Sequence, residues 1–119
     1  MQADTPKACP SAYVVDGDTL RCGSVRQRML GIDAPELPGH CARYRQCAPG
    51  DGFASKRSLN DALRNGRVSF SIVTTDRFGR YFVMAWARLA NLKCWQLQRS
   101  QAICKPRWDN DGLVAATRR

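Results

Sequence analysis

Alternating apolar and polar positions along the chain predict five short strands. The clearest hairpin signal is Asp16-Gly17, a dipeptide that tolerates the backbone angles of a two-residue turn and lies between two apolar runs. Val68, Phe70 and Ile72 alternate with serines, which is typical of a strand with one buried face. The predicted strands cover residues 13–15, 19–20, 25–32, 68–72 and 81–89.

Capping residues and apolar spacing predict two helices. Asp51 is a suitable N-cap for a helix that runs to about Arg64, with Gly66 as its C-terminal stop. Asn91 is a suitable N-cap for a second helix that runs to about Ser100. The predicted order is therefore three strands, a helix, two strands and a helix.

This order favours an α+β fold, a five-stranded OB-type Greek-key β-barrel with two to three packed helices. A flat-sheet α+β fold is the alternative. The length of 119 residues favours one domain. We expect an N-terminal extension over residues 1–12, the barrel domain over 13–108, and a polar tail over 109–119 in which a short third helix follows Asp111.

The aromatic residues have two readings. Strand or helix spacing makes Phe53, Trp86 and Trp95 candidates for the core. The alternative is a platform on which single-stranded nucleic acid stacks. The aromatic residues available for that platform are Phe53, Tyr81, Phe82, Trp86, Trp95 and Trp108.

Composition and charge narrow the classes of function. The chain is 44% hydrophobic and 24% charged, which is a globular composition rather than a disordered or collagenous one. It has no apolar run near the ~18 residues of a membrane span, so no membrane partner is expected. Its net charge is +9 and 15 of its 19 cations are arginine, which predicts a polyanionic partner. The basic residues near the loop at 40–51 either track such a partner or only keep the surface soluble: Arg43, Arg45, Lys56 and Arg57.

Six cysteines in a chain this short favour a disulfide-bonded, exported protein. A bridge between Cys41 and Cys47 is the easiest to form, and the other pairings stay open. We expect a secreted or periplasmic location, with Met1 placed before a mature chain whose signal has been removed. A zinc site using His40, Cys41 and Cys47 is an alternative, although it lacks a fourth ligand.

Four of the ten acidic residues fall within a stretch of 21 residues, in spite of the positive net charge. Asp18 follows the hairpin turn and Asp33 ends the strand that pairs with it, so both carboxylates are expected at one rim of the sheet. Hard oxygen ligands at such a rim suit Ca²⁺ or Mg²⁺. The alternative is that Asp16 and Asp18 serve the turn and Asp33 ends the strand; for Asp16 we prefer that reading.

Three further residues complete the groups that phosphodiester cleavage requires. Glu36, on a segment stiffened by Pro35, is a candidate general base for water, although a lone loop glutamate is usually only solvated. Arg28 and Arg80 are candidates to neutralise charge on a five-coordinate phosphorus. Together with a metal that polarises the phosphoryl oxygen, these side chains predict a phosphodiesterase centre.

Three segments resemble the staphylococcal nuclease family in their order and spacing. They are residues 14–19 (VVDGDT), 28–36 (RMLGIDAPE) and 76–80 (DRFGR), and the resemblance covers about residues 13–108. It implies an OB barrel with packed helices and Ca²⁺-dependent hydrolysis of DNA and RNA that leaves 3′-phosphate ends. It also implies one calcium ion, with another divalent metal as the alternative, single-stranded substrates and a monomer.

The resemblance assigns roles to particular residues. It implies that Asp18, Asp33 and the backbone carbonyl of Ala34 hold the ion, and that Glu36 deprotonates or orients water. Arg28 and Arg80 are the phosphate-binding arginines that it implies. Arg77 and Phe78 are expected to contact substrate; they stand where the type member has Lys-Tyr, so the cation is kept and the phenolic hydroxyl is lost.

Other departures from the family concern the aromatic residues and the helix ends. No aromatic residue precedes Lys105-Pro106, so base stacking on that side is expected to be poorer. The helix at Asn91 lacks the glycine stop of the type member, and the type member's long third helix is not expected here. The second hypothesis is therefore an OB-fold module that binds nucleic acid without cutting it. A third is a disulfide-stapled secreted interaction protein, which explains the cysteines but not the acidic cluster.

Overall fold

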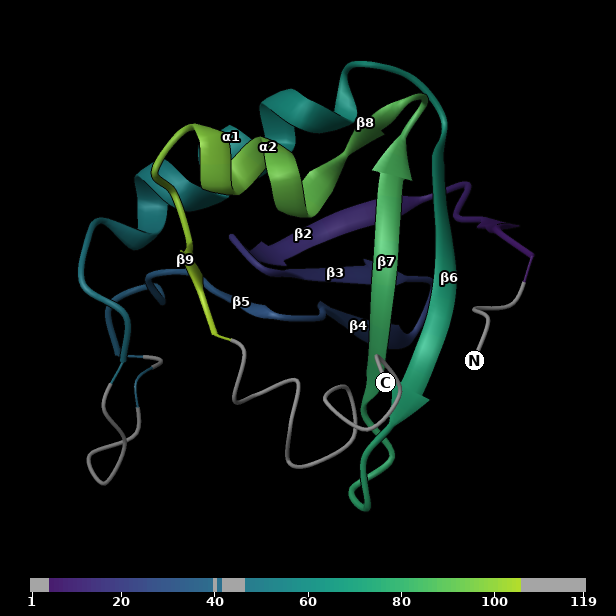
Figure 1. Cartoon of the computed structure of the whole chain (residues 1–119), viewed down its shortest axis with the longest axis horizontal. Helices are drawn as coiled ribbons and strands as arrows, with labels where there is room; N and C mark the ends of the chain where they lie inside the picture. Colours follow the sequence, from purple (N-terminus) through teal and green to yellow (C-terminus); the bar gives the residue numbers. More distant parts are fainter. Residues whose placement is uncertain (1–4, 40, 42–46, 106–119) are drawn as a thin grey trace.

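The computed structural model describes residues 5–39, 41 and 47–105 of the chain (Figure 1). Within these residues the fold is α+β, a curled mixed sheet that forms a half-barrel with two helices packed at one end. The helices are α1 (Gly52–Leu63) and α2 (Leu92–Gln98). The strands are β1 (Lys7–Ala8), β2 (Ala12–Asp16), β3 (Thr19–Cys22), β4 (Val25–Met29), β5 (Ile32–Asp33), β6 (Val68–Thr75), β7 (Tyr81–Ala87), β8 (Ala90–Asn91) and β9 (Ile103–Cys104).

The main sheet has the strand order β1-β6-β7-β4-β3-β2, with β8 on β7, while β5 and β9 form a separate pair. Neighbouring strands are antiparallel except β4 and β7, which are parallel. β1 and β2 lie at opposite ends of this order although only residues 9–11 separate them in the chain. The first strands therefore draw the two ends of the sheet together, and β6 and β7 cross the direction of β2–β4 (Figure 1).

The predicted hairpin is confirmed, and the predicted third strand is shorter than expected. β2 and β3 pair across a two-residue turn of Gly17 and Asp18, because Asp16 still belongs to β2 and pairs with Thr19, with a bulge between Val14 and Asp16. The predicted turn residues, Asp16 and Gly17, are therefore one position too early, and Gly17 is not among the glycines of positive φ. The strand predicted for residues 25–32 ends at Met29, because Gly31 has a φ of 84°, in the left-handed region. This bend carries Asp33 away from β4 into β5, where it pairs with Ile103 of β9.

Both predicted helix caps are confirmed. The Asp51 side chain accepts hydrogen bonds from the backbone N–H groups of Phe53 (2.9 Å) and Ala54 (3.2 Å). The Asn91 side chain accepts one from the N–H of Cys94 at 3.0 Å. α2 ends at Gln98 rather than Ser100, because Ser100 has a φ of 57° and turns the chain where no glycine stands.

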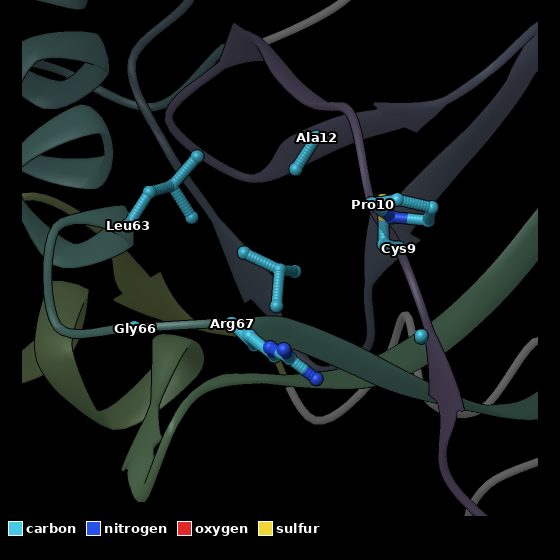
Figure 2. A pocket seen from close by; sticks show the side chains of 8 residues that line it. Cys9, Pro10, Ala12, Leu63, Gly66 and Arg67 are labelled. Atoms are coloured by element: carbon cyan, nitrogen blue, oxygen red, sulfur yellow. The ribbon is translucent and has the colours of Figure 1, made fainter.

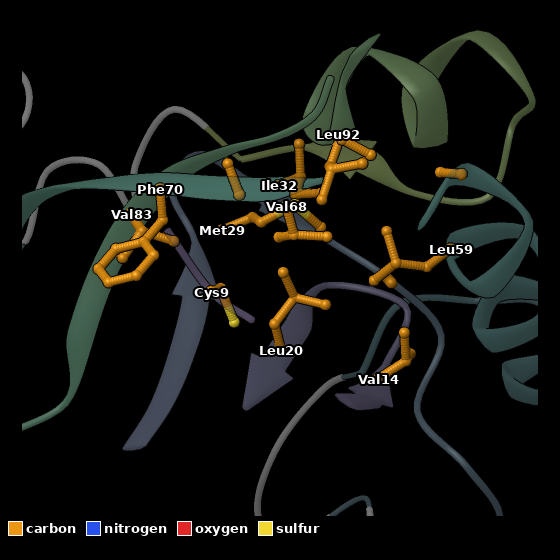
Figure 3. Packing of buried hydrophobic residues seen from close by; sticks show 14 of the residues in the cluster. Cys9, Val14, Leu20, Met29, Ile32, Leu59, Val68, Phe70, Val83 and Leu92 are labelled. Carbon is orange, nitrogen blue, oxygen red and sulfur yellow. The ribbon is translucent and has the colours of Figure 1, made fainter. Parts of the chain in front are cut away.

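The core fills the space between the curled sheet and the two helices (Figure 3). Its fully buried apolar side chains come from both halves of the chain, and the largest are Leu20, Met29, Ile32, Leu59, Val83 and Leu92. The core role predicted for Phe53 is wrong: its side chain is 54% exposed. The buried positions of α1 are 52, 55, 59 and 62, and residue 53 lies off this stripe.

The core position predicted for two tryptophans is confirmed for Trp95 and wrong for Trp86. Trp95 packs partly buried against the core, and its Nε1 donates a hydrogen bond to the carbonyl of Ser58 at 3.0 Å. Trp86 alternates in β7 with the buried residues Ala85 and Ala87, so its half-buried side chain lies on the opposite face of the strand.

Two disulfides are present among the described residues. Cys41–Cys47 confirms the predicted local bridge, and Cys9–Cys22 ties the β1–β2 connection to the end of β3. The second pair closes a loop of 13 residues, which the chain-entropy model values at about 3 kcal/mol. Both bridges are compatible with an extracellular or periplasmic protein.

Several sequence-based expectations lie outside the described residues. They concern His40, Arg43, Arg45, Trp108 and the third helix after Asp111. Part of the stretch taken as an N-terminal extension is described, and Lys7–Ala8 pairs with β6 there. In the described part of the chain, neither helix combines the length and the apolar character that crossing a membrane needs.

Candidate metal and phosphate site

Two buried aspartates converge on one guanidinium group. Arg28 Nη2 lies 3.3 Å from Asp18 Oδ2 and 3.4 Å from Asp33 Oδ1, and the side chains of Asp18 and Asp33 are only 5% and 1% exposed. The register explains the meeting, because Thr19 pairs with Arg28 across β3 and β4 while the bend at Gly31 returns Asp33 to the same rim. The convergence expected from the sequence is therefore present.

Backbone and side-chain donors fix the orientation of the Asp18 carboxylate. Its Oδ2 accepts a hydrogen bond from the N–H of Ala34 at 3.0 Å, and its Oδ1 accepts one from Thr19 Oγ1 at 2.8 Å. The N–H of Met29 donates to the Asp18 carbonyl at 2.8 Å. Because Ala34 follows Asp33 directly, the same contact also holds the two aspartates side by side.

A buried polar network holds the turn that carries Asp18. Gln96 of α2 is fully buried, and its Nε2 donates hydrogen bonds to the carbonyls of Gly17 (2.8 Å) and Ser55 (2.9 Å). Ser55 Oγ in turn donates to the carbonyl of Gln101 at 2.7 Å. Gln96 and Ser55 could not be predicted from the sequence, because a polar residue in an amphipathic helix gives no signal that its side chain points inward.

This network leaves no room for a side chain at Gly17. A Cβ there would lie 1.8 Å from Ser55 Oγ and 3.0 Å from the Cβ of Ala34. We expect Gly17→Ala to lower the free energy of unfolding by about 1–3 kcal/mol, the usual cost of overpacking, as measured by urea denaturation. Gly23→Asn is the control, because that glycine is in open space and asparagine tolerates its φ of 63°. Equal stability of the two variants would contradict this account.

Glu36 is half-buried on the segment that leaves β5. Its backbone is held closely, since a Cβ on Gly52 would lie 2.2 Å from the Glu36 carbonyl oxygen. Its Oε2 lies 3.0 Å from Cys47 Sγ, and the ligand atoms of Glu36, Cys41 and Cys47 all lie within 4.8 Å of one another. The two sulfurs are joined in a disulfide, so neither is the thiolate that binds zinc.

Arg80 is held by the turn before β7. Its Nε donates to Asp76 Oδ2 at 2.6 Å, and its backbone N–H donates to Asp76 Oδ1 at 2.9 Å. β4 and β7 pair in parallel with Arg28 opposite Phe82, and the Arg80 guanidinium lies 5.8 Å from the centre of the Phe82 ring. Arg28, Phe82 and Arg80 therefore share one face of the sheet.

Asp76 gives this turn a dependence on pH. Desolvation alone would raise the pKa of Asp76, but hydrogen bonds from the backbone and side chain of Arg80 and from the N–H of Phe78 outweigh it and lower that pKa below 3.8. The carboxylate therefore contributes stability above pH 3.8, and this contribution is lost as the pH falls through the lowered pKa of the folded state.

We expect Asp76→Asn to flatten the acid side of the stability profile. Wild-type protein and variant should differ most above pH 3.8, and the difference should shrink as the pH falls below that value, in urea unfolding followed by circular dichroism. Asp61→Asn, which removes an exposed carboxylate from α1, serves as the control and should leave the shape of the profile unchanged. A difference between wild-type protein and Asp76→Asn that stays constant down the acid limb would refute the role given to Asp76.

The tip of the same turn exposes an aromatic ring beside two cations. Phe78 is 72% exposed, and its ring centre lies 5.0 Å from the Arg77 guanidinium and 5.9 Å from that of Arg80. An exposed ring flanked by cations can stack on a base while the cations meet phosphates. The expected substrate-contacting residues thus lie next to Arg80.

One hollow among the described residues lies away from this site. A cavity of about 510 Å³ is lined by apolar side chains and Arg67 between β1, the end of α1 and the start of β6 (Figure 2). None of the acidic residues of the candidate site lines it. The chemistry-bearing side chains are therefore arranged on the rim and outer face of the sheet rather than in this cavity.

Comparison of the chain with protein-family models finds no match, and comparison with curated protein sequences finds none either.

Proposed function

We propose that the protein is a Ca²⁺-dependent endonuclease that hydrolyses phosphodiester bonds of DNA and RNA and leaves 3′-phosphate ends. The observation that carries the proposal is the convergence of Asp18 and Asp33 on Arg28. Two carboxylates that are buried together need a cation beside them, either Arg28 or a metal ion. The net charge of +9 favours an anionic substrate such as a nucleic acid. The three segments that resemble the staphylococcal nuclease family include these residues.

The residues at this rim fit a hard divalent cation. Oxygens of two carboxylates approach the same nitrogen within 3.4 Å, so they are aimed at one point. Asp18, Asp33 and the backbone carbonyl of Ala34 would hold Ca²⁺, with water and substrate phosphate as the remaining ligands. When bound, the ion would polarise the phosphoryl oxygen and offset its negative charge.

The protein side chains perform the remaining steps. Glu36 orients the attacking water and accepts its proton, since it is the carboxylate next along the chain from Asp33 and has the rigid backbone described above. Arg28 and Arg80, on one face of the sheet, donate hydrogen bonds to the oxygens of the five-coordinate phosphorus. Arg77 and Phe78 contact the adjacent nucleotide.

We propose that the fold is an OB-type barrel and that the protein is exported. The order β2-β3-β4-β7-β6, with the parallel β4–β7 pair and with β1 joining β6, supports a five-stranded Greek-key barrel. The two disulfides support secretion or a periplasmic location. A monomer that prefers single strands completes the proposal.

A non-catalytic OB module that binds nucleic acid is the second candidate. The exposed, cation-flanked ring of Phe78 favours it, because such a ring serves binding whether or not the strand is cut. The complete set of Asp18, Asp33, Glu36, Arg28 and Arg80 favours the nuclease, because a binding module has no need of a buried acidic pair.

Analysis of the product ends separates the two candidates. Single-stranded DNA incubated with the protein and Ca²⁺ should yield fragments that carry 3′-phosphate and 5′-hydroxyl ends, detected by labelling before and after phosphatase treatment. A filter-binding assay runs in parallel. Retention of intact DNA on the filter with every divalent metal would reject the nuclease and support the binding module.

A further inference from the structure

A second cation-flanked ring, separate from that of Phe78, belongs to Tyr13 in β2, the end strand of the main sheet. Tyr13 of β2 is 52% exposed, so its ring is accessible to a ligand. Its ring centre lies 5.1 Å from the Arg21 guanidinium of β3 and 5.5 Å from the Lys56 ammonium of α1. Three separate elements thus place their side chains together at one point of the surface.

The strand register extends this cluster across the sheet. Tyr13 pairs with Arg21, and Arg21 pairs with the exposed Arg26 of β4. Each of the three lies next to a buried residue of its own strand (Val14, Leu20 and Gln27), so all three lie on the outer face. We call the four residues Tyr13, Arg21, Arg26 and Lys56 the Tyr13 track.

The Tyr13 track leads to the candidate site. Gln27 pairs with Tyr81 in the parallel β4–β7 ladder, so Arg26 and Arg80, the residues just before them, are neighbours across the two strands. The row from Tyr13 to Arg80 crosses four strands, or about 14 Å at the usual spacing of strands. Lys56 lies one helical turn, about 6 Å, beyond Gly52, whose backbone contacts Glu36.

We infer that the Tyr13 track binds a single-stranded nucleic acid beyond the phosphodiester that is cleaved. A base stacks on the Tyr13 ring in place of the Lys56 ammonium, and Lys56, Arg21 and Arg26 pair with successive phosphates. An exposed planar ring with cations around it suits a polymer that offers both a base and a phosphate at each step. The inference rests on the proposed function only in placing the track beside the phosphodiester that is cleaved. Binding of nucleic acid to the track does not depend on cleavage.

The test compares two lengths of oligothymidylate by fluorescence anisotropy in EDTA, which prevents Ca²⁺-dependent cleavage. One oligonucleotide has about 4 nucleotides and one about 16, the range of site sizes of OB folds. Tyr13→Ala should weaken binding of the longer oligonucleotide at least about fivefold, the effect of losing one stacked base. Binding of the shorter one should stay within about twofold of wild type, since it can be held at the cleavage site alone.

Two matched variants separate stacking from charge. Tyr13→Phe keeps the ring and should bind both lengths as the wild type does. Arg21→Ala should reduce the salt dependence of long-oligonucleotide binding by about 0.7 in the log–log slope, the share of one phosphate contact on a single strand. Arg64→Ala removes an exposed arginine at the far end of α1 and should reduce that slope less.

Three results would overturn the inference. They are unchanged binding of the longer oligonucleotide by Tyr13→Ala, an equal loss for both lengths, and an equal loss for inorganic polyphosphate, which has no bases. The proposed hydrolysis is tested separately from this binding. If wild-type protein does not cleave DNA in Ca²⁺ while Tyr13→Ala still loses affinity for the longer oligonucleotide, the activity is rejected and the Tyr13 track stands.

Discussion

Replacing Glu36 by glutamine is expected to lower the turnover of single-stranded DNA by about 10²–10⁴-fold, the usual contribution of a general base. The variant keeps the size of the side chain and the backbone packing of Glu36 against Gly52 but cannot accept a proton from water. Binding of DNA measured in EDTA should therefore stay within about twofold of wild type. The rate is measured with saturating DNA in Ca²⁺, so that the loss is assigned to turnover.

Asp61→Asn is the matched control for the loss of one negative charge. Asp61 lies exposed on α1 and pairs only weakly with Arg64, at 3.8 Å. Its replacement should leave turnover unchanged. If Glu36→Gln cleaves DNA at the rate of Asp61→Asn, Glu36 has no role as a base, and the activity requires another proton acceptor.

Replacing Arg28 by alanine is expected to destabilise the metal-free protein by about 3 kcal/mol, because it removes a cation from beside two buried carboxylates. Ca²⁺ should then restore more stability to the variant than it adds to the wild type, since the carboxylates no longer have Arg28 between them. Urea denaturation with Ca²⁺ and with EDTA measures both effects. Cleavage should also fall, because a phosphate-binding group is lost.

Arg64→Ala controls for the loss of an arginine that is exposed. The Arg64–Asp61 pair has side chains 84% and 60% exposed, so this variant should lose less than about 1 kcal/mol. If Arg28→Ala is as stable as Arg64→Ala in EDTA, the buried carboxylates do not depend on Arg28. If Ca²⁺ adds no stability to either protein, the acidic pair is not a calcium site.

The parts of the fold that follow local rules could be predicted from the sequence. Asp51 and Asn91 signal the helix starts because a side-chain oxygen can accept from the first N–H groups, and both cap their helices. Asp16-Gly17 predicts the hairpin correctly, although the turn itself is formed by the next pair of residues, Gly17 and Asp18. The sequence does not show that the predicted strand 25–32 is split into β4 and β5. An apolar run that contains a glycine is compatible with one straight strand, and the left-handed φ of Gly31 is seen only in the structure.

In the candidate site, too, contacts set by neighbouring strands could be predicted, and contacts set by distant helix packing could not. The sequence predicts Asp18 and Asp33 at one rim because the pairing of their strands makes them neighbours, and the structure brings them together around Arg28. Gln96, which holds the Gly17 turn from 79 residues away, could not be found because its role depends on how α2 packs. Phe53 was misplaced because hydrophobicity alone does not say on which face of α1 a residue near the helix start will lie.

The most direct test of the central claim is the addition of Ca²⁺ to EDTA-treated protein while hydrolysis of single-stranded DNA is followed. We predict no cleavage in EDTA and a rate that rises with added Ca²⁺ until it saturates, as expected if the pair of Asp18 and Asp33 holds the ion. Binding of DNA without cleavage at every Ca²⁺ concentration, or cleavage that persists in EDTA, would contradict the proposed calcium-dependent nuclease.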